Sequence, residues 1–190
     1  KTAEAYQAEN QCVQSEKIVH LMQPELNDNL LTTHANIILA ECLLTRETVD
    51  YALFQRLLLK TALQQGFDQR INALYSHLYA HKRQWVNAAH AMLNSDYEQQ
   101  YANQQAWRFI QRVTTSEFSV EQLRDPILSP LLELHILVRK FGLSPNELRP
   151  AVSDWQRQYS LHPLSQNLPD DIAKGLLLSP IQPSTVAVLL

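Results

Sequence analysis

The sequence predicts an all-α protein built as an array of antiparallel helix pairs, and three observations lead to this prediction. Its 190 residues include three glycines, too few for the tight hairpins and phosphate-binding loops that depend on glycine. Apolar residues recur at i, i+3, i+4 and i+7, the spacing of one helix face. Segments of similar length, bounded by capping and breaking residues, follow one another in pairs. We therefore expect a TPR-like α-solenoid, in which each helix buries its apolar face on neighbouring helices.

The composition is that of a globular protein rather than a disordered one. Hydrophobic residues make up 45% and charged residues 18% of the chain, enough for a sizeable core. The net charge is −3 and Lys and Arg are scattered, which argues against nucleic acid as the main partner. No apolar run reaches the roughly 18 residues of a membrane-spanning helix.

In the first half of the chain, helices are expected over residues 2–12, 14–23, 29–44, 48–65 and 68–81. Pro24 ends the second helix because proline has no N–H to donate. Thr45 or Thr48 is the expected cap of the fourth helix, and Gly66 ends it. Asp68 caps the fifth. The apolar face of the second helix is predicted to contain Ile18, Leu21 and Met22.

In the second half, helices are expected over residues 84–93, 96–113, 119–126, 127–141 and 144–161. Ser119 and Gln122 have the spacing of a capping box at the start of the third. Gly142 ends the fourth, and Pro145 suits the first turn of the last. Helix 127–141 is predicted to be the most buried, because apolar residues nearly surround it: Leu131, Leu134, Ile136, Leu137 and Val138.

The last predicted helix contains Trp155 and Tyr159, four residues apart and therefore on one face. These two side chains are expected to pack on a preceding helix. Pro163 is expected to stop the helix, and Pro169 to direct the chain onward. All four residues are interpreted as structural.

Three regions follow from this reading of the chain. Residues 1–163 form the TPR-like helical domain, and residues 164–184 a proline-rich connector with one helical turn at 171–177. Residues 185–190 are apolar and β-branched, so we expect them to be the first strand of a following α/β domain.

The two cysteines, Cys12 and Cys42, are 30 residues apart, close to the period of about 34 residues in helix-pair repeats. Equivalent positions on neighbouring pairs lie side by side, so one interpretation is a disulfide, which needs an oxidising compartment. The alternative is two buried free thiols that pack as small apolar side chains.

No catalytic, cofactor or metal site is predicted. The sequence has no glycine-rich phosphate loop, nucleophile elbow or CxxC pair. His77 and His81 are four apart, but the glutamate of a zinc-protease motif is missing, and we interpret them as exposed or capping residues. The same interpretation is given to His20, His34, His90, His135 and His162. Asp170 and Asp171 are expected to cap the turn that follows them.

Aromatic residues gather in the middle third of the chain: Tyr75, Tyr79, Trp85, Tyr97, Tyr101 and Trp107. One interpretation places some of them on a partner-binding surface, where Trp and Tyr are favoured. The other is ordinary packing between helices.

Three stretches resemble the amino-terminal domain of the penicillin-binding-protein activator lipoproteins, the LpoA family. The first is Pro24-Glu25-Leu26-Asn27-Asp28. The second is Asn103-Gln104-Gln105-Ala106-Trp107. The third is Asp154-Trp155-Gln156-Arg157-Gln158-Tyr159, followed by Pro163 and Leu168-Pro169. Their order and spacing agree with the family over nearly the whole chain, although the middle third matches loosely.

The resemblance implies a Gram-negative outer-membrane lipoprotein that faces the periplasm and takes part in peptidoglycan synthesis. Its lipid anchor would lie upstream of this chain. Its following domain, of which residues 185–190 would be the start, would dock on a class A bifunctional penicillin-binding protein and stimulate transpeptidation. The helical domain would support that docking domain without enzymatic activity, cofactor or small-molecule substrate.

Two other classes of function remain open on the sequence. One is a cytoplasmic helix-repeat adaptor that binds a peptide or helix in a groove. The other is an enzyme of a type that shows no recognisable motif.

Overall fold

The computed structural model describes residues 3, 11–22, 29–61, 68–142 and 145–177. Its helices are grouped into two compact units, residues 1–98 and 99–190. All of its regular elements are helical over the described residues, which confirms the predicted fold class. The predicted strand at 185–190 lies outside the described residues, as do Gly66 and nearly all of the helix predicted at 2–12.

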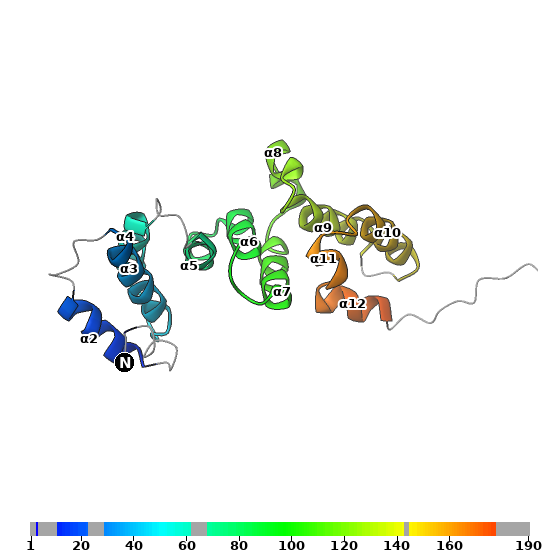
Figure 1. The fold of residues 1–190 in the computed structure, drawn as a ribbon. Helices are drawn as coiled ribbons and strands as arrows, with labels where there is room; N and C mark the ends of the chain where they lie inside the picture. Colours follow the sequence, from blue (N-terminus) through cyan, green and yellow to red (C-terminus); the bar gives the residue numbers. More distant parts are fainter. Residues whose placement is uncertain (1–2, 4–10, 23–28, 62–67, 143–144, 178–190) are drawn as a thin grey trace, which may run out of the picture. The chain divides into compact units, whose positions relative to one another are not determined.

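The first unit contains five helices that are described (Figure 1): α2 (Cys12–Met22), α3 (Asn29–Leu44), α4 (Tyr51–Thr61), α5 (Asp68–His81) and α6 (Trp85–Leu93). Consecutive helices pack on one another, and α3 also contacts α5. The core has α3 at its centre, since residues 35–40, 42 and 43 are all buried. A half-buried ion pair joins α3 to α5, where Arg70 donates to both carboxylate oxygens of Glu41 at 3.0 and 2.7 Å.

Two details of the first unit differ from the sequence prediction. The cap of α4 is Asp50 rather than Thr45 or Thr48: its Oδ1 accepts from the backbone N–H groups of Ala52 and Leu53 at 3.1 and 3.0 Å. The buried side of α2 consists of Ser15 and Val19, whereas Leu21 is 78% and Met22 51% exposed. The predicted apolar face of this helix is therefore wrong, because the side that faces α3 carries Ser15 and Val19 instead.

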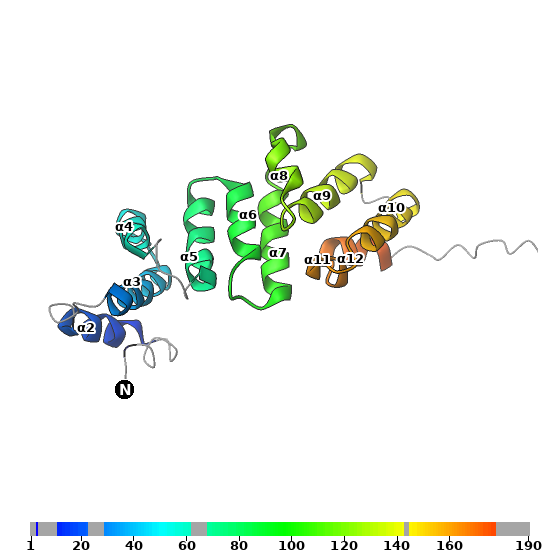
Figure 2. The same ribbon diagram turned by 45° about the horizontal axis from the view of Figure 1, so that its top comes forward.

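Helices α5 and α6 lie antiparallel and side by side (Figure 2). The chain reverses at Arg83, which has a positive φ of 58° and lets the Gln84 N–H reach back to the Tyr79 carbonyl at 2.9 Å, the pattern of a Schellman turn. Two side chains then lock the pair: Ser76 Oγ donates to the Ala88 carbonyl at 3.0 Å, and Asn72 Nδ2 to the Asn94 carbonyl at 3.2 Å.

The second unit contains seven described elements: α7 (Gln99–Ile110), the 3₁₀ turn η2 (Thr115–Glu117), α8 (Val120–Arg124), α9 (Ser129–Phe141), α10 (Pro145–Gln158), α11 (Pro163–Gln166) and α12 (Asp170–Leu177). The predicted capping box of α8 is confirmed, because Ser119 and Gln122 each bond the other's backbone N–H. Gly142, with φ of 62°, ends α9 as predicted.

Helix α9 is less enclosed than the sequence suggests. Leu131, Leu132 and Leu134 are fully buried, but Ile136, Leu137 and Val138 are only partly covered. Two of these line a groove toward α10. The prediction that this helix is the most buried is therefore wrong, and α3 in the first unit has that position.

The segment after α10 is packed rather than extended. Helix α10 ends at Gln158, five residues before Pro163, which begins α11 instead of stopping the preceding helix. Leu164 on α11 and Ile172 on α12 are both fully buried, and both short helices contact α10. Residues 164–177 therefore belong to the helical unit. The helical turn predicted at 171–177 is confirmed as α12, whereas the semi-extended connector predicted before it is wrong, because α11 forms there.

Helix α12 is held by the polar face of α7. The indole Nε1 of Trp107, which is 1% exposed, donates to Asp171 Oδ2 at 3.0 Å, and Gln111 donates to the same oxygen at 2.8 Å. Gln104 Oε1 accepts from the Asp170 N–H at 3.1 Å. Asp171 thus links two helices rather than only capping its own.

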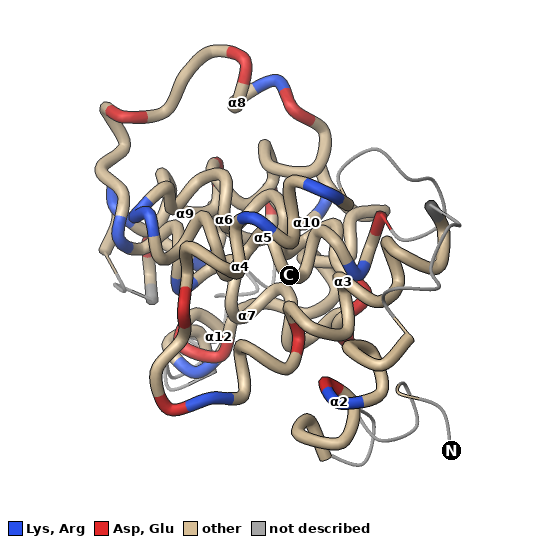
Figure 3. The backbone as a smooth tube through the Cα atoms, turned by 90° about the vertical axis from the view of Figure 1, so that its left-hand side faces the viewer, with Lys and Arg blue, Asp and Glu red and all other residues tan. Residues whose placement is uncertain are grey.

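Positively and negatively charged residues are interspersed along the described backbone (Figure 3), as the scattered Lys and Arg positions of the sequence suggest. Over the described residues, every helix is too short or too polar to cross a lipid bilayer.

The packing of α12 predicts a large effect for Ile172→Ala. Because this side chain is fully buried, its truncation leaves a cavity, and the free energy of unfolding of the second unit should fall by about 2–5 kcal/mol. Urea denaturation measures it. Lys174→Ala, an exposed change on the same helix, is the control and should alter stability by less than about 0.5 kcal/mol. Equal, small effects of both variants would mean that this segment is the loose connector predicted from sequence.

Candidate functional site

The histidines form no metal centre in the part of the chain that the structure describes. Among the described residues, no group of three or more His, Cys, Asp or Glu side chains is arranged to hold a metal ion. His81 stacks on the Tyr51 ring with centroids 3.6 Å apart. His77 Nε2 lies 3.4 Å from the Tyr97 hydroxyl, and burial lowers the pKa of this imidazole below its ordinary value. His162 caps α11 by accepting from the Leu164 N–H at 3.2 Å.

His135 is a core residue, so its interpretation as an exposed or capping histidine is wrong. It is 2% exposed, its Nε2 lies 3.2 Å from the Val113 carbonyl, and its ring meets those of Trp107 and Phe118 edge to face. Burial lowers the pKa of His135 below 6.5; the bond to Val113 opposes this shift and the nearby Arg139 adds to it. The side chain is therefore held neutral inside the second unit.

This environment predicts that acid destabilises the second unit through His135. Because its pKa is lower in the folded than in the unfolded state, the unfolded chain binds the proton more readily, and the free energy of unfolding falls as the pH drops below about 6.5. His135→Gln should show a smaller loss between pH 7 and pH 5 in urea denaturation. Since His77 and His162 are unchanged in the variant, the difference isolates His135. Parallel pH profiles for the two proteins would contradict the prediction.

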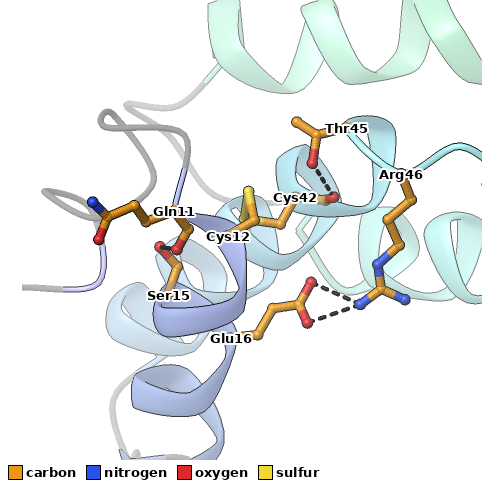
Figure 4. A network of polar contacts seen from close by, with 7 residues as sticks. All are labelled: Gln11, Cys12, Ser15, Glu16, Cys42, Thr45 and Arg46. Carbon is orange, nitrogen blue, oxygen red and sulfur yellow. Dashed lines mark hydrogen bonds and ion pairs between the residues drawn. A yellow bond between two sulfur atoms is a disulfide. The ribbon is translucent and has the colours of Figure 1, made fainter.

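The start of α2 is joined to the end of α3 by a covalent and an ionic contact (Figure 4). Cys12 and Cys42 form a disulfide with Cα atoms 5.3 Å apart. One turn along α2, both carboxylate oxygens of Glu16 accept from one guanidinium nitrogen of Arg46 at 2.8 Å. Ser15, which is fully buried, donates to the Ala3 carbonyl at 2.8 Å.

The disulfide compensates for weak apolar packing of α2. Val19 is the one hydrophobic residue of α2 that is fully covered among those described, and Val13 is 62% exposed. The exposed ion pair adds little, because Arg46 is half in solvent. The disulfide therefore supplies much of the attachment of this helix to the unit.

We predict that removing the disulfide loosens α2. For a bond that closes a loop of 30 residues, loss of the cross-link should lower the free energy of unfolding by about 3–4 kcal/mol. In the Cys12→Ser/Cys42→Ser variant, hydrogen exchange should accelerate in α2 while α5 and α6 stay protected. Dithiothreitol should reproduce the effect in the parent protein and do nothing to the variant. Two titratable thiols in the native, unreduced protein would show that the free-thiol interpretation is the right one.

The four residues near the end of the chain that were interpreted as structural lie at contacts between helices or at helix starts. Trp155 is 3% exposed, and its Nε1 donates to the Pro130 carbonyl at 3.0 Å. The Tyr159 hydroxyl lies 3.2 Å from Ser129 Oγ. Both contacts tie α10 to the first turn of α9. Pro163 starts α11, and Pro169 is buried just before α12.

Each unit also has a recess of moderate size. In the second unit a groove of about 440 Å³ runs between α9 and α10, with Ile136, Leu137 and Trp155 among its apolar lining. In the first unit a pocket of about 370 Å³ lies between α5 and α6. Its lining includes Tyr75 and Tyr79, two members of the aromatic group noted in the sequence.

These features define a module of packed helix pairs. A solved structure of LpoA from Haemophilus influenzae has a similar fold, with a TM-score of 0.71 and 17% sequence identity over 93% of this chain. The chain spans 34% of the length of that structure. No family model and no curated protein matches the sequence. The resemblance seen in the sequence is thus confirmed as an LpoA amino-terminal-domain-like fold.

Proposed function

We propose that this chain is the helical support domain of a periplasmic activator of a class A bifunctional penicillin-binding protein. The observation that carries the proposal is the structural similarity to Haemophilus influenzae LpoA over 93% of the chain. The domain connects an upstream lipid anchor in the outer membrane to a following domain, and that following domain docks on the synthase and stimulates transpeptidation.

The internal bonding of the helices suits such a support role. From α2 to α6 consecutive helices pack on one another, and an array of this kind gains length one pair at a time. Side-chain bonds to backbone carbonyls, such as Ser76 to Ala88 and Trp155 to Pro130, set the angle between helices. The disulfide Cys12–Cys42 suits an oxidising compartment such as the periplasm. Regulation by binding needs no catalytic group, and the domain acts without one.

The test uses the full-length protein, a deletion lacking residues 1–177, and residues 1–190 alone. Each is assayed for binding to the detergent-solubilised synthase and for stimulation of its transpeptidase activity. The full-length and deleted proteins should both bind and stimulate in solution, whereas residues 1–190 alone should do neither. In cells the deletion should fail, because the docking domain then lacks its support.

A matched control replaces residues 1–177 in the cell by an unrelated helix-repeat domain of similar length. Restored growth would support a role as a spacer. Binding and stimulation by residues 1–190 alone would overturn the proposal and make this domain the docking element. Failure of the full-length protein to bind any peptidoglycan synthase would overturn the activator role itself.

A further inference from the structure

The pocket between α5 and α6 in the first unit combines aromatic and amide side chains. It encloses about 370 Å³, near the lower end of the roughly 300–1,000 Å³ typical of small-molecule sites. Its lining residues are Asn72, Tyr75, Tyr79, Asn87, His90 and Ala91. None of these six carries a carboxylate, ammonium or guanidinium group, so the described lining offers no fixed charge to pair with a charged ligand.

One wall of the pocket is aromatic. Tyr75 and Tyr79 lie one turn apart on α5, with ring centroids 5.7 Å apart and planes only 26° from parallel. Both are partly exposed. Tyr75 also packs against the hydrophobic core of the first unit, so the Tyr79 ring is the more accessible of the two. Burial, with a smaller contribution from Tyr79, raises the pKa of the Tyr75 hydroxyl, which keeps it protonated and able both to donate and to accept a hydrogen bond.

The polar groups of the pocket are amides. Asn72 uses its Nδ2 to donate to the Asn94 carbonyl at 3.2 Å, which orients the amide. Its Oδ1 remains an acceptor. Asn87, on the facing helix α6, is exposed at the pocket rim. Ala91 is 5% exposed, and its small side chain leaves the floor open between these two helices.

The pocket is also preorganised. The bonds from Ser76 to the Ala88 carbonyl and from Asn72 to the Asn94 carbonyl fix α5 against α6, and the turn at Arg83 sets their separation. A ligand therefore meets walls that are already in place, which reduces the entropy lost on binding.

We infer that this pocket binds a short neutral saccharide carrying acetamido groups. The C–H face of a pyranose ring packs on an aromatic face, and its hydroxyls need partners that both donate and accept, which asparagine amides and a phenol supply. An acetamido group pairs with an asparagine amide in the same way. The saccharide is a ligand and not a substrate, and the inference does not rest on the proposed activator role.

The test titrates the 190-residue chain with triacetylchitotriose and follows binding by saturation-transfer NMR. We expect saturable binding. Asn87→Ala and Tyr79→Leu should each weaken it by about tenfold, the equivalent of one lost hydrogen bond or ring contact. Asn87 is exposed, so its variant leaves the fold intact and keeps the test valid if Tyr79→Leu is unstable.

Matched controls separate the pocket from the rest of the surface. Gln69→Ala removes another exposed amide of α5, and Tyr101→Leu another partly exposed tyrosine, which is 44% exposed. Both should bind within about twofold of the parent. Maltotriose, which lacks acetamido groups, should bind more weakly.

Three results would overturn the inference. The first is the absence of saturable triacetylchitotriose binding. The second is binding that Asn87→Ala and Tyr79→Leu leave unchanged. The third is tighter binding of the neutral peptide trialanine that the same two variants abolish, because the pocket would then be a peptide site.

Discussion

The second unit depends on the requirement that a buried indole N–H find an acceptor. An indole donor left unbonded in the interior costs about 1–3 kcal/mol, and both buried tryptophans of the described residues avoid this cost by bonding to a different helix. Trp107 on α7 reaches Asp171 on α12, and Trp155 on α10 reaches the Pro130 carbonyl on α9. Each bond is directional, so the two together define how four helices meet. The surrounding leucines supply most of the hydrophobic free energy but little of this direction.

In the first unit the helices are held together by other kinds of contact. Its centre is α3, which is buried along most of its second half, and the helices around it differ in how they are held. Helices α5 and α6 are joined by two side-chain-to-backbone bonds, whereas α2 has little apolar contact and is attached by a disulfide and an ion pair. The stability of α2 therefore depends on the redox state of its compartment, in agreement with the periplasmic location proposed for the protein.

Two of the stretches that carry the family resemblance, 103–107 and 154–159, lie among the described residues and make contacts between helices. In the stretch 103–107, Gln104 and Trp107 hold α12, and in the stretch 154–159, Trp155 and Tyr159 hold α9. Through these bonds the residues determine how the helices of the second unit meet. The proposed saccharide site depends instead on exposed or partly exposed residues such as Asn87 and Tyr79.

The sequence alone determined the all-α class, the helix-pair pattern and most helix positions, because periodicity, capping boxes and terminal glycines act locally. The helix at 29–44 and the capping box at Ser119 are examples. Tertiary structure decided the burial and packing of residues whose partners are distant in the sequence. The burial of His135 needs Val113 and Trp107, the half-open side of α9 results from its groove with α10, and the packing of residues 164–177 needs a buried donor on α7. Proline at 163 is compatible with a helix end or a helix start, and only the helices beside it determine which one forms.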